Sequence, residues 1–362
     1  FPAISKPKIV GFFSVDGERN YIPTCDKLKY LKLPGNKKIN FDLNLGYEKV
    51  IRKAESHKNE KIDHLLRFIV DHKDHLARRT TEDPRALGFD FVCFRGLLRQ
   101  IMCSPYEYKD DWCILATKYE GNIYLCAKET DQKRHEILTE TELQKKFCSY
   151  GFKFEQYVLS DEPNKEPDPS VPVNENEEFA CVFSSTLEDH QLLYGAEMDG
   201  ILSSSIYDME NTDINKMEFI EVKVKRRESN SNQRRNFLKF KLRDWWCQSF
   251  LVGIEKIYIG TRNDYGIVEE ISMMQMKNIP KMSSEYWSAS VCVDFLSQFL
   301  RTIRKVLSKV NSATTVYEFY WNPRPGNIIN YKIHYDKNEY SFLPEWYLQE
   351  IRPIIISNDE VN

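Results

Sequence analysis

Two short strand-like fragments constrain this chain more than any other part of its sequence. The first, LLYGAEMDGI, contains Glu197 and Asp199, and the second, FIEVKVKR, contains Glu221 and Lys223. Successive side chains of a strand point to opposite faces, so each charged pair shares one face of its strand. The apolar residues between and around them then point into a core.

If the two strands are neighbours, three carboxylates and one ammonium group meet in a small volume. Like charges so close repel one another, and a divalent cation commonly relieves that repulsion. Oxygen ligands favour Mg²⁺ or Mn²⁺ over zinc or copper. For either fragment alone, the solvated face of an antiparallel sheet is the more common origin of such alternation. Together, a carboxylate followed by Glu-x-Lys on the next strand is typical of metal-dependent nucleases. There the carboxylates hold the metal, the metal polarises the phosphate and activates water, and the lysine balances charge.

Composition and motifs exclude several other classes of protein. The net charge over 362 residues is −3, so any nucleic-acid surface must be local. The sequence contains no GxGxxG, no Gly-x4-Gly-Lys and no nucleophile elbow, and no bound NAD cofactor is expected. Nine cysteines without a Cys-x-x-Cys pair suit a reducing compartment and predict neither a disulfide framework nor a zinc site. Without a membrane-spanning apolar run or a signal peptide, we expect the protein in the nucleus or cytoplasm.

Apolar periodicity predicts one α/β domain over residues 1–362, with a mixed sheet flanked by helices. We expect helices over residues 45–76, 91–102 and 230–251, and one that starts at a capping box formed by Thr139 and Glu142. Expected strands form a hairpin over residues 112–129 and continue at 179–184, 192–199, 218–224, KIYIGT and GIVEEISM. Residues 160–177 are rich in Pro, Asp, Glu and Asn and predict an irregular loop. Arg95, in the second helix, is expected to be buried and paired.

Basic charge is concentrated just after the acidic cluster. Residues 223–243 contain nine basic side chains and one acid, Glu228. Such a run is more often a solvated helix face than a binding site, but its position favours a path for a phosphate backbone into a metal site. Helical spacing places Lys241, Asp244 and Gln248 on one face, from which Gln248 could reach the cluster.

With these residues identified, the chain resembles the DXO family of RNA decapping and 5′-to-3′ exonuclease enzymes, including fungal relatives that bind a nuclear 5′-to-3′ exonuclease. The resemblance runs from VGFFSVD near the start to SFLPEWY near the end. Its motifs are Arg95 in FRG followed by SPYE, Glu155 in GFKFE, Glu197 and Asp199 in GAEMDG, Glu221 and Lys223 in EVK, and Gln248 in WWCQSFL.

The resemblance implies a role for each of these positions. The implied metal ligands are Glu155, Glu197, Asp199, Glu221 and the main-chain carbonyl of Val222. The implied catalytic residues are Glu197, Asp199, Glu221 and Lys223. The implied contacts to the RNA 5′ end are Arg19, Glu60, Phe94, Arg95, Gly96, Glu197, Lys223 and Gln248.

The expected protein is therefore a PD-(D/E)XK-type nuclease that uses two Mg²⁺ or Mn²⁺ ions to direct water at the 5′ end of single-stranded RNA. Its implied substrates are triphosphorylated, incompletely methylated or NAD-capped ends. An alternative from another class is a binding protein that stabilises or stimulates a partner exonuclease. This chain keeps all of the acids, which favours the enzyme. A nuclease for duplex DNA is a weaker alternative, since no base-reading element is evident.

Overall fold

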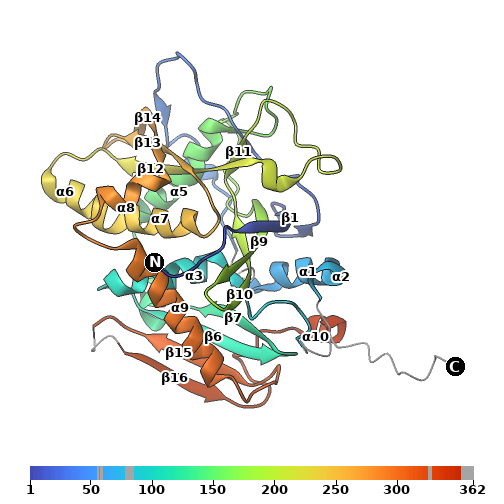
Figure 1. Ribbon diagram of the computed structural model, residues 1–362. Coiled ribbons are helices and arrows are strands. Elements are labelled where there is room, and N and C mark those ends of the chain that lie inside the picture. The colour runs from blue at the N-terminus through green and yellow to red at the C-terminus, as the bar shows by residue number, and fades with distance from the viewer. Residues whose placement is uncertain (55–56, 58–59, 78–84, 325–327, 352–362) are drawn as a thin grey trace.

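The computed structural model describes residues 1–54, 57, 60–77, 85–324 and 328–351, and it contains two mixed sheets with helices around and between them (Figure 1). In the described residues, the larger sheet has nine strands in the spatial order β16-β15-β6-β7-β5-β10-β9-β1-β2. Only the β7-β5 and β5-β10 neighbours are parallel. Its strands are β1 (Lys8–Val15), β2 (Tyr21–Ile22), β5 (Phe91–Phe94), β6 (Trp112–Tyr119), β7 (Asn122–Lys128), β9 (Glu178–Leu187), β10 (His190–Glu197), β15 (Val316–Trp321) and β16 (Ile329–His334).

The smaller sheet has seven strands in the order β4-β14-β13-β12-β11-β3-β8. Its β12-β13 and β11-β3 neighbours are parallel. The strands are β3 (Tyr30–Leu31), β4 (Phe41–Asp42), β8 (Leu159–Ser160), β11 (Gly200–Leu202), β12 (Glu218–Arg226), β13 (Lys256–Arg262) and β14 (Ile267–Gln275). The expected α/β class, with mixed sheets flanked by helices, is confirmed, and the strands are divided between two sheets.

The described α-helices are α1 (Asp63–Asp71), α2 (Lys73–Leu76), α3 (Arg95–Cys103), α4 (Asp131–Leu138), α5 (Glu142–Val158), α6 (Ser231–Asn236), α7 (Leu242–Phe250), α8 (Ile279–Met282), α9 (Ala289–Val306) and α10 (Glu345–Ile351). A π-helix, η5 (Phe237–Lys241), joins α6 to α7. No described helix has the length and hydrophobicity needed to cross a bilayer.

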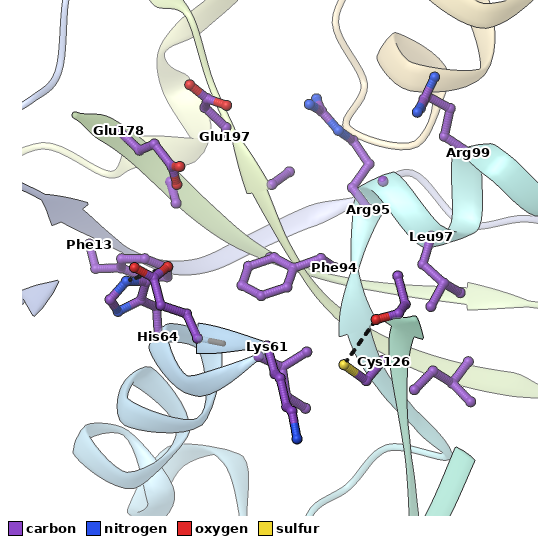
Figure 2. Close-up of a pocket in the computed structure, with 18 of the residues that line it drawn as sticks. Phe13, Lys61, His64, Phe94, Arg95, Leu97, Arg99, Cys126, Glu178 and Glu197 are labelled. Carbon is purple, nitrogen blue, oxygen red and sulfur yellow. Dashed lines mark hydrogen bonds and ion pairs between the residues drawn. The ribbon is translucent and has the colours of Figure 1, made fainter. Parts of the chain in front are cut away.

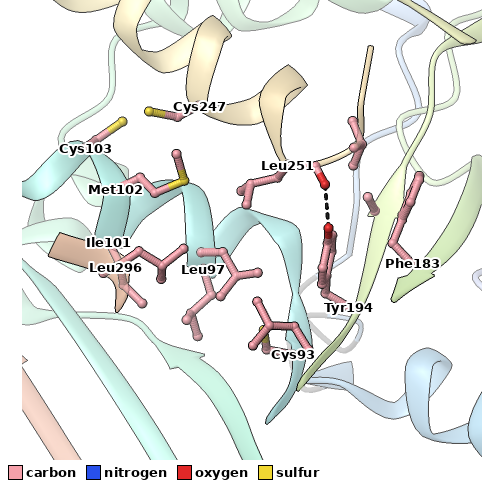
Figure 3. Close-up of a cluster of buried hydrophobic side chains, with 14 of the residues drawn as sticks. Cys93, Leu97, Ile101, Met102, Cys103, Phe183, Tyr194, Cys247, Leu251 and Leu296 are labelled. Atoms are coloured by element: carbon pink, nitrogen blue, oxygen red, sulfur yellow. Dashed lines mark hydrogen bonds between the residues drawn. The ribbon is translucent and has the colours of Figure 1, made fainter. Parts of the chain in front are cut away.

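The largest hydrophobic core holds the two sheets together through α3, α7 and α9. Helix α3 packs against both α7 and α9. Leu97 and Ile101 of α3, Leu251 after α7 and Leu296 of α9 are buried in one cluster (Figure 3). The Tyr194 hydroxyl of β10 donates a 2.5 Å hydrogen bond to the carbonyl oxygen of Leu251. This core fixes the start of α3 relative to the end of α7.

Strand β12 lies between α5 and α7, and its successive side chains point alternately toward one helix and the other. Ile220 and Val222 are buried in a cluster with Phe154 of α5. Glu221 and Lys223 point to the opposite face, where Gln248 of α7 contacts both. The alternation inferred from FIEVKVKR is therefore confirmed.

Two expected helices are wrong in extent. Residues 91–94 form β5, in the middle of the larger sheet, and only residues 95–103 are helical. A central strand paired with parallel neighbours is buried on both faces and lacks period-two alternation, so FVCF reads equally well as buried helix. Within the expected helix 45–76, the described helical segments are short. Helix α1 contains the apolar residues of this stretch that are buried, among them Leu65, Leu66 and Ile69. Residues 55–56 and 58–59 of that prediction lie outside the described residues.

Other boundaries also differ from the expectation. The capping box is formed by Thr141 and Gln144, whereas Thr139 ends α4. The two boxes are two residues apart in a sequence that offers both patterns. The expected helix over residues 230–251 is α6, η5 and α7 in succession. The hairpin over residues 112–129 and the strands around 179–199 and 218–224 are confirmed as β6-β7, β9-β10 and β12.

Candidate active site

The candidate site lies where the chain passes from the larger sheet to the smaller one. Strand β10 ends at Glu197 and β11 begins at Gly200, so Asp199 lies in the link between the sheets. Met198 is buried, and its N–H donates a 2.8 Å hydrogen bond to the carbonyl oxygen of Phe179. The strands paired with β12 are β11 and β13, and neither of them carries Glu197. The two sheets therefore bring the predicted acids together, rather than two adjacent strands.

Glu221, Lys223 and Gln248 form a closed hydrogen-bonded triad on the α7 face of β12. The Lys223 ammonium donates to Glu221 Oε1 at 2.5 Å and to Gln248 Oε1 at 3.2 Å. Gln248 Nε2 donates to the same Glu221 oxygen at 2.7 Å. Glu221 is 1% exposed, and its second oxygen, Oε2, is buried without a hydrogen-bond partner. A buried carboxylate oxygen without a donor is costly unless a cation satisfies it.

Asp199 is hydrogen-bonded to the edge of the same strand. The N–H of Val222 donates a 2.7 Å hydrogen bond to Asp199 Oδ2. The N–H and C=O of one strand residue point to the same edge, so the Val222 carbonyl also faces the link that carries Asp199. Both the side chain and the main-chain group predicted as ligands lie at this edge.

The acidic residues are close enough for each to influence the ionisation of the others. Burial and then the charge of Asp199 raise the pKa of Glu155, which α5 contributes. Burial and then Glu221 raise the pKa of Asp199 to about 7. The Glu197 side chain lines a cavity. Loss of hydration and then the charge of Glu178 raise the pKa of Glu197 to about 8. Burial disfavours the Lys223 ammonium, but the charges of Glu221 and Asp199 outweigh it and raise the lysine pKa.

These residues fit a divalent cation in their chemistry. Carboxylate and carbonyl oxygens are the ligands that hard cations take, and the unpartnered Glu221 Oε2 supplies a buried one. Within the described part of the chain, no three His, Cys, Asp or Glu side chains are already arranged closely enough to enclose a metal ion. The carboxylates repel one another, so binding an ion requires them to turn toward it and toward one another.

A cavity of about 580 Å³ opens beside Glu197 (Figure 2). Six of the eight predicted RNA contacts line it: Arg19, Glu60, Phe94, Arg95, Gly96 and Glu197. The remaining two, Lys223 and Gln248, belong to the triad. The Phe94 ring lies in the cavity wall against Gly195, where a Cβ would come within 2.8 Å of that ring. A larger residue at position 195 would displace the aromatic wall.

Arg95 is buried, as expected, but its side chain has no hydrogen bond or ion pair among the residues that the structure describes. Its side chain starts at the first residue of α3, and its Nη1 atom is buried without a hydrogen-bond partner. The guanidinium lowers the pKa of both Glu197 and Asp199, although burial and neighbouring acids outweigh it. A buried cation with an unsatisfied N–H fits a phosphate or carboxylate of a ligand, which would supply the missing acceptor.

Arg19 and Glu60 line the cavity, but they are already bound to protein groups. Arg19 contacts Glu60 at 2.8 Å, Glu178 at 2.6 Å and the carbonyl oxygen of Asn176 at 2.8 Å. Burial opposes ionisation of Glu60, but hydrogen bonds from Arg19 outweigh it and lower the pKa of Glu60 to about 2. Arg19 thus ties together three segments of the cavity wall.

Replacing Arg19 with Met is expected to lower the free energy of unfolding by about 3 kcal/mol, because two carboxylates lose a buried partner. Urea denaturation measures the change. The matched control is Lys27→Met, whose partner Glu177 is more exposed and whose loss should cost less than about 1 kcal/mol. If Arg19→Met kept its stability and lost only RNA binding, Arg19 would be a substrate contact and not a structural tie.

Glu178 is a cavity residue that the sequence reasoning missed. Glu178 lies two positions before Ala180, and Ala180 pairs with Glu197 in the β9-β10 register. Glu178 and Glu197 therefore point to the same face of the sheet, toward the cavity. Alternation along EEFACVF combined with the hairpin register could have identified it. Its charge is the largest electrostatic contribution to the raised pKa of Glu197.

The basic run over residues 223–243 is only partly free to bind RNA. Arg226 pairs with Asp264 at 2.6 Å, Arg227 with Glu269 at 3.1 Å and Arg234 with Glu228 at 3.3 Å. Arg243 is buried and contacts Glu107 at 3.1 Å, so it is a structural residue. Lys239 and Lys241 of η5 form no salt bridge within the described residues.

Comparison with known proteins gives a consistent assignment. Residues 5–348 match the model of the family described as RAI1 like PD-(D/E)XK nuclease. The chain is 35% identical over 353 residues to the decapping and exoribonuclease protein Rai1 of Drosophila melanogaster, covering 96% of this chain and 92% of that one. It is 31% identical over 354 residues to the human decapping and exoribonuclease protein, covering 96% of this chain and 86% of that one.

Solved structures share the fold. Rai1 of Scheffersomyces stipitis, in complex with (3′-NADP)⁺ and calcium ion, has a TM-score of 0.82 at 18% identity and covers 97% of both chains. Rai1 of Candida albicans, in complex with pU5-Mn²⁺, has a TM-score of 0.81 at 18% identity, covering 97% of this chain and 96% of that one. With the motifs, the fold and the family match in agreement, this chain belongs to the RAI1-like PD-(D/E)XK nuclease family.

Proposed function

We propose that this protein is a divalent-metal-dependent hydrolase of RNA 5′ ends, which removes unmethylated or NAD caps or 5′ pyrophosphate and then degrades RNA in the 5′-to-3′ direction. The observation that carries the proposal is two unsatisfied buried groups, Glu221 Oε2 and Arg95 Nη1, on side chains that both lie close enough to Glu197 to shift its pKa. The first fits a cation and the second fits an anion, and the phosphates of an RNA 5′ end bound with a metal ion supply both.

The proposed metal site consists of Glu155, Glu197, Asp199, Glu221 and the carbonyl of Val222. Two Mg²⁺ or Mn²⁺ ions bound there would polarise the scissile phosphate and activate water. Lys223 places positive charge beside Glu221, where negative charge develops on the phosphate. Gln248 fixes the orientation of both side chains through its two hydrogen bonds.

The cavity provides the proposed site for the 5′ nucleotide. Phe94 offers an aromatic wall for a base, and Arg95 offers donors for a phosphate. The Rai1 proteins of Scheffersomyces stipitis and Candida albicans were solved with (3′-NADP)⁺ and with pU5, respectively, which supports nucleotide binding by a protein of this fold. Arg19 and Glu60 would then act mainly by holding the wall in shape.

A second candidate function is stabilisation of a nuclear 5′-to-3′ exonuclease partner, with the protein in the nucleus or cytoplasm. It does not require the buried triad, whereas the hydrolase does. A protein that served only as a partner would be as stable with an apolar residue in place of Glu221, because an isolated buried carboxylate oxygen is unfavourable. The presence of the complete triad in this chain therefore favours the hydrolase.

The proposal is tested by incubating the protein with 5′-triphosphate, unmethylated-cap, NAD-capped and 5′-monophosphate RNAs in Mn²⁺ and identifying the released species by mass. We expect pyrophosphate, an intact cap nucleotide or mononucleotides from the respective ends, and no product in chelator. Absence of every product at Mn²⁺ concentrations that saturate the site would reject the hydrolase and favour the partner function.

A further inference from the structure

One exposed and one half-buried aromatic ring, Tyr108 and Phe240, lie beside the helix that carries Gln248. Tyr108 is 60% exposed, and its ring centroid lies 5.4 Å from that of Phe240 in η5. Three residues earlier in η5, Phe237 is buried against Trp245. Across the described residues, neither Tyr108 nor Phe240 belongs to a hydrophobic core cluster. Core packing therefore does not account for this ring pair.

Cations surround the two rings. The Lys239 ammonium lies 5.6 Å from the Tyr108 centroid and 5.1 Å from the Phe240 centroid. The Arg243 guanidinium lies 5.9 Å from the Phe240 centroid and also binds the carbonyl oxygen of Tyr106 at 2.8 Å. Arg243 thus attaches the segment that carries Tyr108 to α7.

The helix that carries Gln248 continues directly from η5, which carries Phe240 of the ring pair. Gln248, Asp244 and Lys241 share a face of the helix, and Asp244 pairs with Arg99, which lines the cavity. Gln248 follows Lys241 by seven positions in the helix, which is about 10 Å along the axis. A strand whose 5′ end lies at Glu221 would need to extend by more than its first nucleotide to reach the rings.

We propose that Tyr108, Lys239, Phe240 and Lys241 form a stacking platform for bases of the RNA strand that follow the 5′ end. The proposal rests on the proposed function, since it assumes that the 5′ end occupies the cavity. Aromatic faces stack on any base and lysines attract the phosphates, a combination found in proteins that bind single strands without sequence preference. π-helical segments such as η5 are frequent at functional sites.

The test compares two 5′-monophosphate RNAs, a dinucleotide and a ten-nucleotide strand, in the parent and in Tyr108→Ala. We expect KM for the longer RNA to rise about tenfold, because one stacked base is lost, and the dinucleotide kinetics to stay unchanged. Tyr108→Trp should restore the parent value. The matched control is Tyr265→Ala, which removes a tyrosine that is 83% exposed on the turn between β13 and β14.

Fluorescence anisotropy of the ten-nucleotide RNA bound to each variant in chelator separates this proposal from the hydrolase proposal. Binding about tenfold weaker in Tyr108→Ala, but not in Tyr265→Ala, supports the platform even when no RNA is hydrolysed. Equal binding by Tyr108→Ala and the parent would overturn the platform while leaving hydrolysis of the dinucleotide untouched. Equal losses on short and long RNA would also overturn it, because the residue would then support the cavity itself.

Discussion

Glu221→Gln is expected to lower the rate of RNA hydrolysis by a factor of at least about 10², with the fold retained. Glutamine has the same size as glutamate, and its amide oxygen can still accept from Lys223 and Gln248. In glutamine an NH₂ group replaces the unpartnered Oε2, and this group repels a cation instead of binding it. Single-turnover hydrolysis in saturating Mn²⁺ measures the loss. Activity within about tenfold of the parent would reject Glu221 as a metal ligand.

The same cluster predicts how the metal-free protein responds to pH. In the folded chain the pKa of Glu197 is raised to about 8 and that of Asp199 to about 7. Both carboxyls ionise near pH 4 when the chain is unfolded. The folded chain therefore holds more protons between about pH 4 and pH 8, and its stability falls as the pH rises through that window.

Thermal melting in chelator at pH 5 and pH 8 measures this dependence. We expect the melting temperature of the parent to fall toward pH 8, and the fall to be smaller in Asp199→Asn. Addition of Mn²⁺ should raise the melting temperature more at pH 8, where the carboxylates are ionised. The control is Glu210→Gln, an exposed acid in the loop before β12, which should leave the pH dependence of melting unchanged.

The sequence was sufficient to predict which side chains share each face of β12, because alternation along one strand is a local property. Glu221 and Lys223 share a face and Val222 is buried opposite them, as the pattern predicts. Gln248 was also accessible, since helical spacing places it on the face that carries Lys241 and Asp244. Local periodicity was therefore enough to predict all three members of the triad.

The positions that sequence reasoning misread depend on contacts between distant segments. Residues 91–94 are a strand because β7 and β10 lie on either side of them, and neither neighbour is adjacent in sequence. Arg19 was expected to contact RNA, yet it is buried and paired with Glu60 and Glu178, which lie on other segments. The link at Asp199 joins two sheets, which a single expected sheet could not reveal.

Lys223→Met is the second substitution with a large expected effect, and it separates catalysis from metal binding. The lysine ammonium donates a hydrogen bond to Glu221 Oε1 at 2.5 Å, so it competes with a cation for the same carboxylate. Methionine keeps the length of the side chain but removes the charge that balances the phosphate. We expect hydrolysis to fall by about 10² or more, while Mn²⁺ affinity measured by calorimetry stays equal to that of the parent or becomes tighter.

The same strand supplies a matched control for this comparison. Lys225 follows two residues later on the same face of β12 and is equally buried, but it pairs with Glu228 at 2.9 Å and lies 4.6 Å from the Phe237 ring centroid. Lys225→Met should therefore leave both hydrolysis and Mn²⁺ affinity near the parent values. If Lys223→Met lost Mn²⁺ binding, the lysine would be organising the carboxylates rather than acting on the phosphate. Because the two lysines differ chiefly in which acid they contact, the difference between their variants isolates the role of the charge beside Glu221.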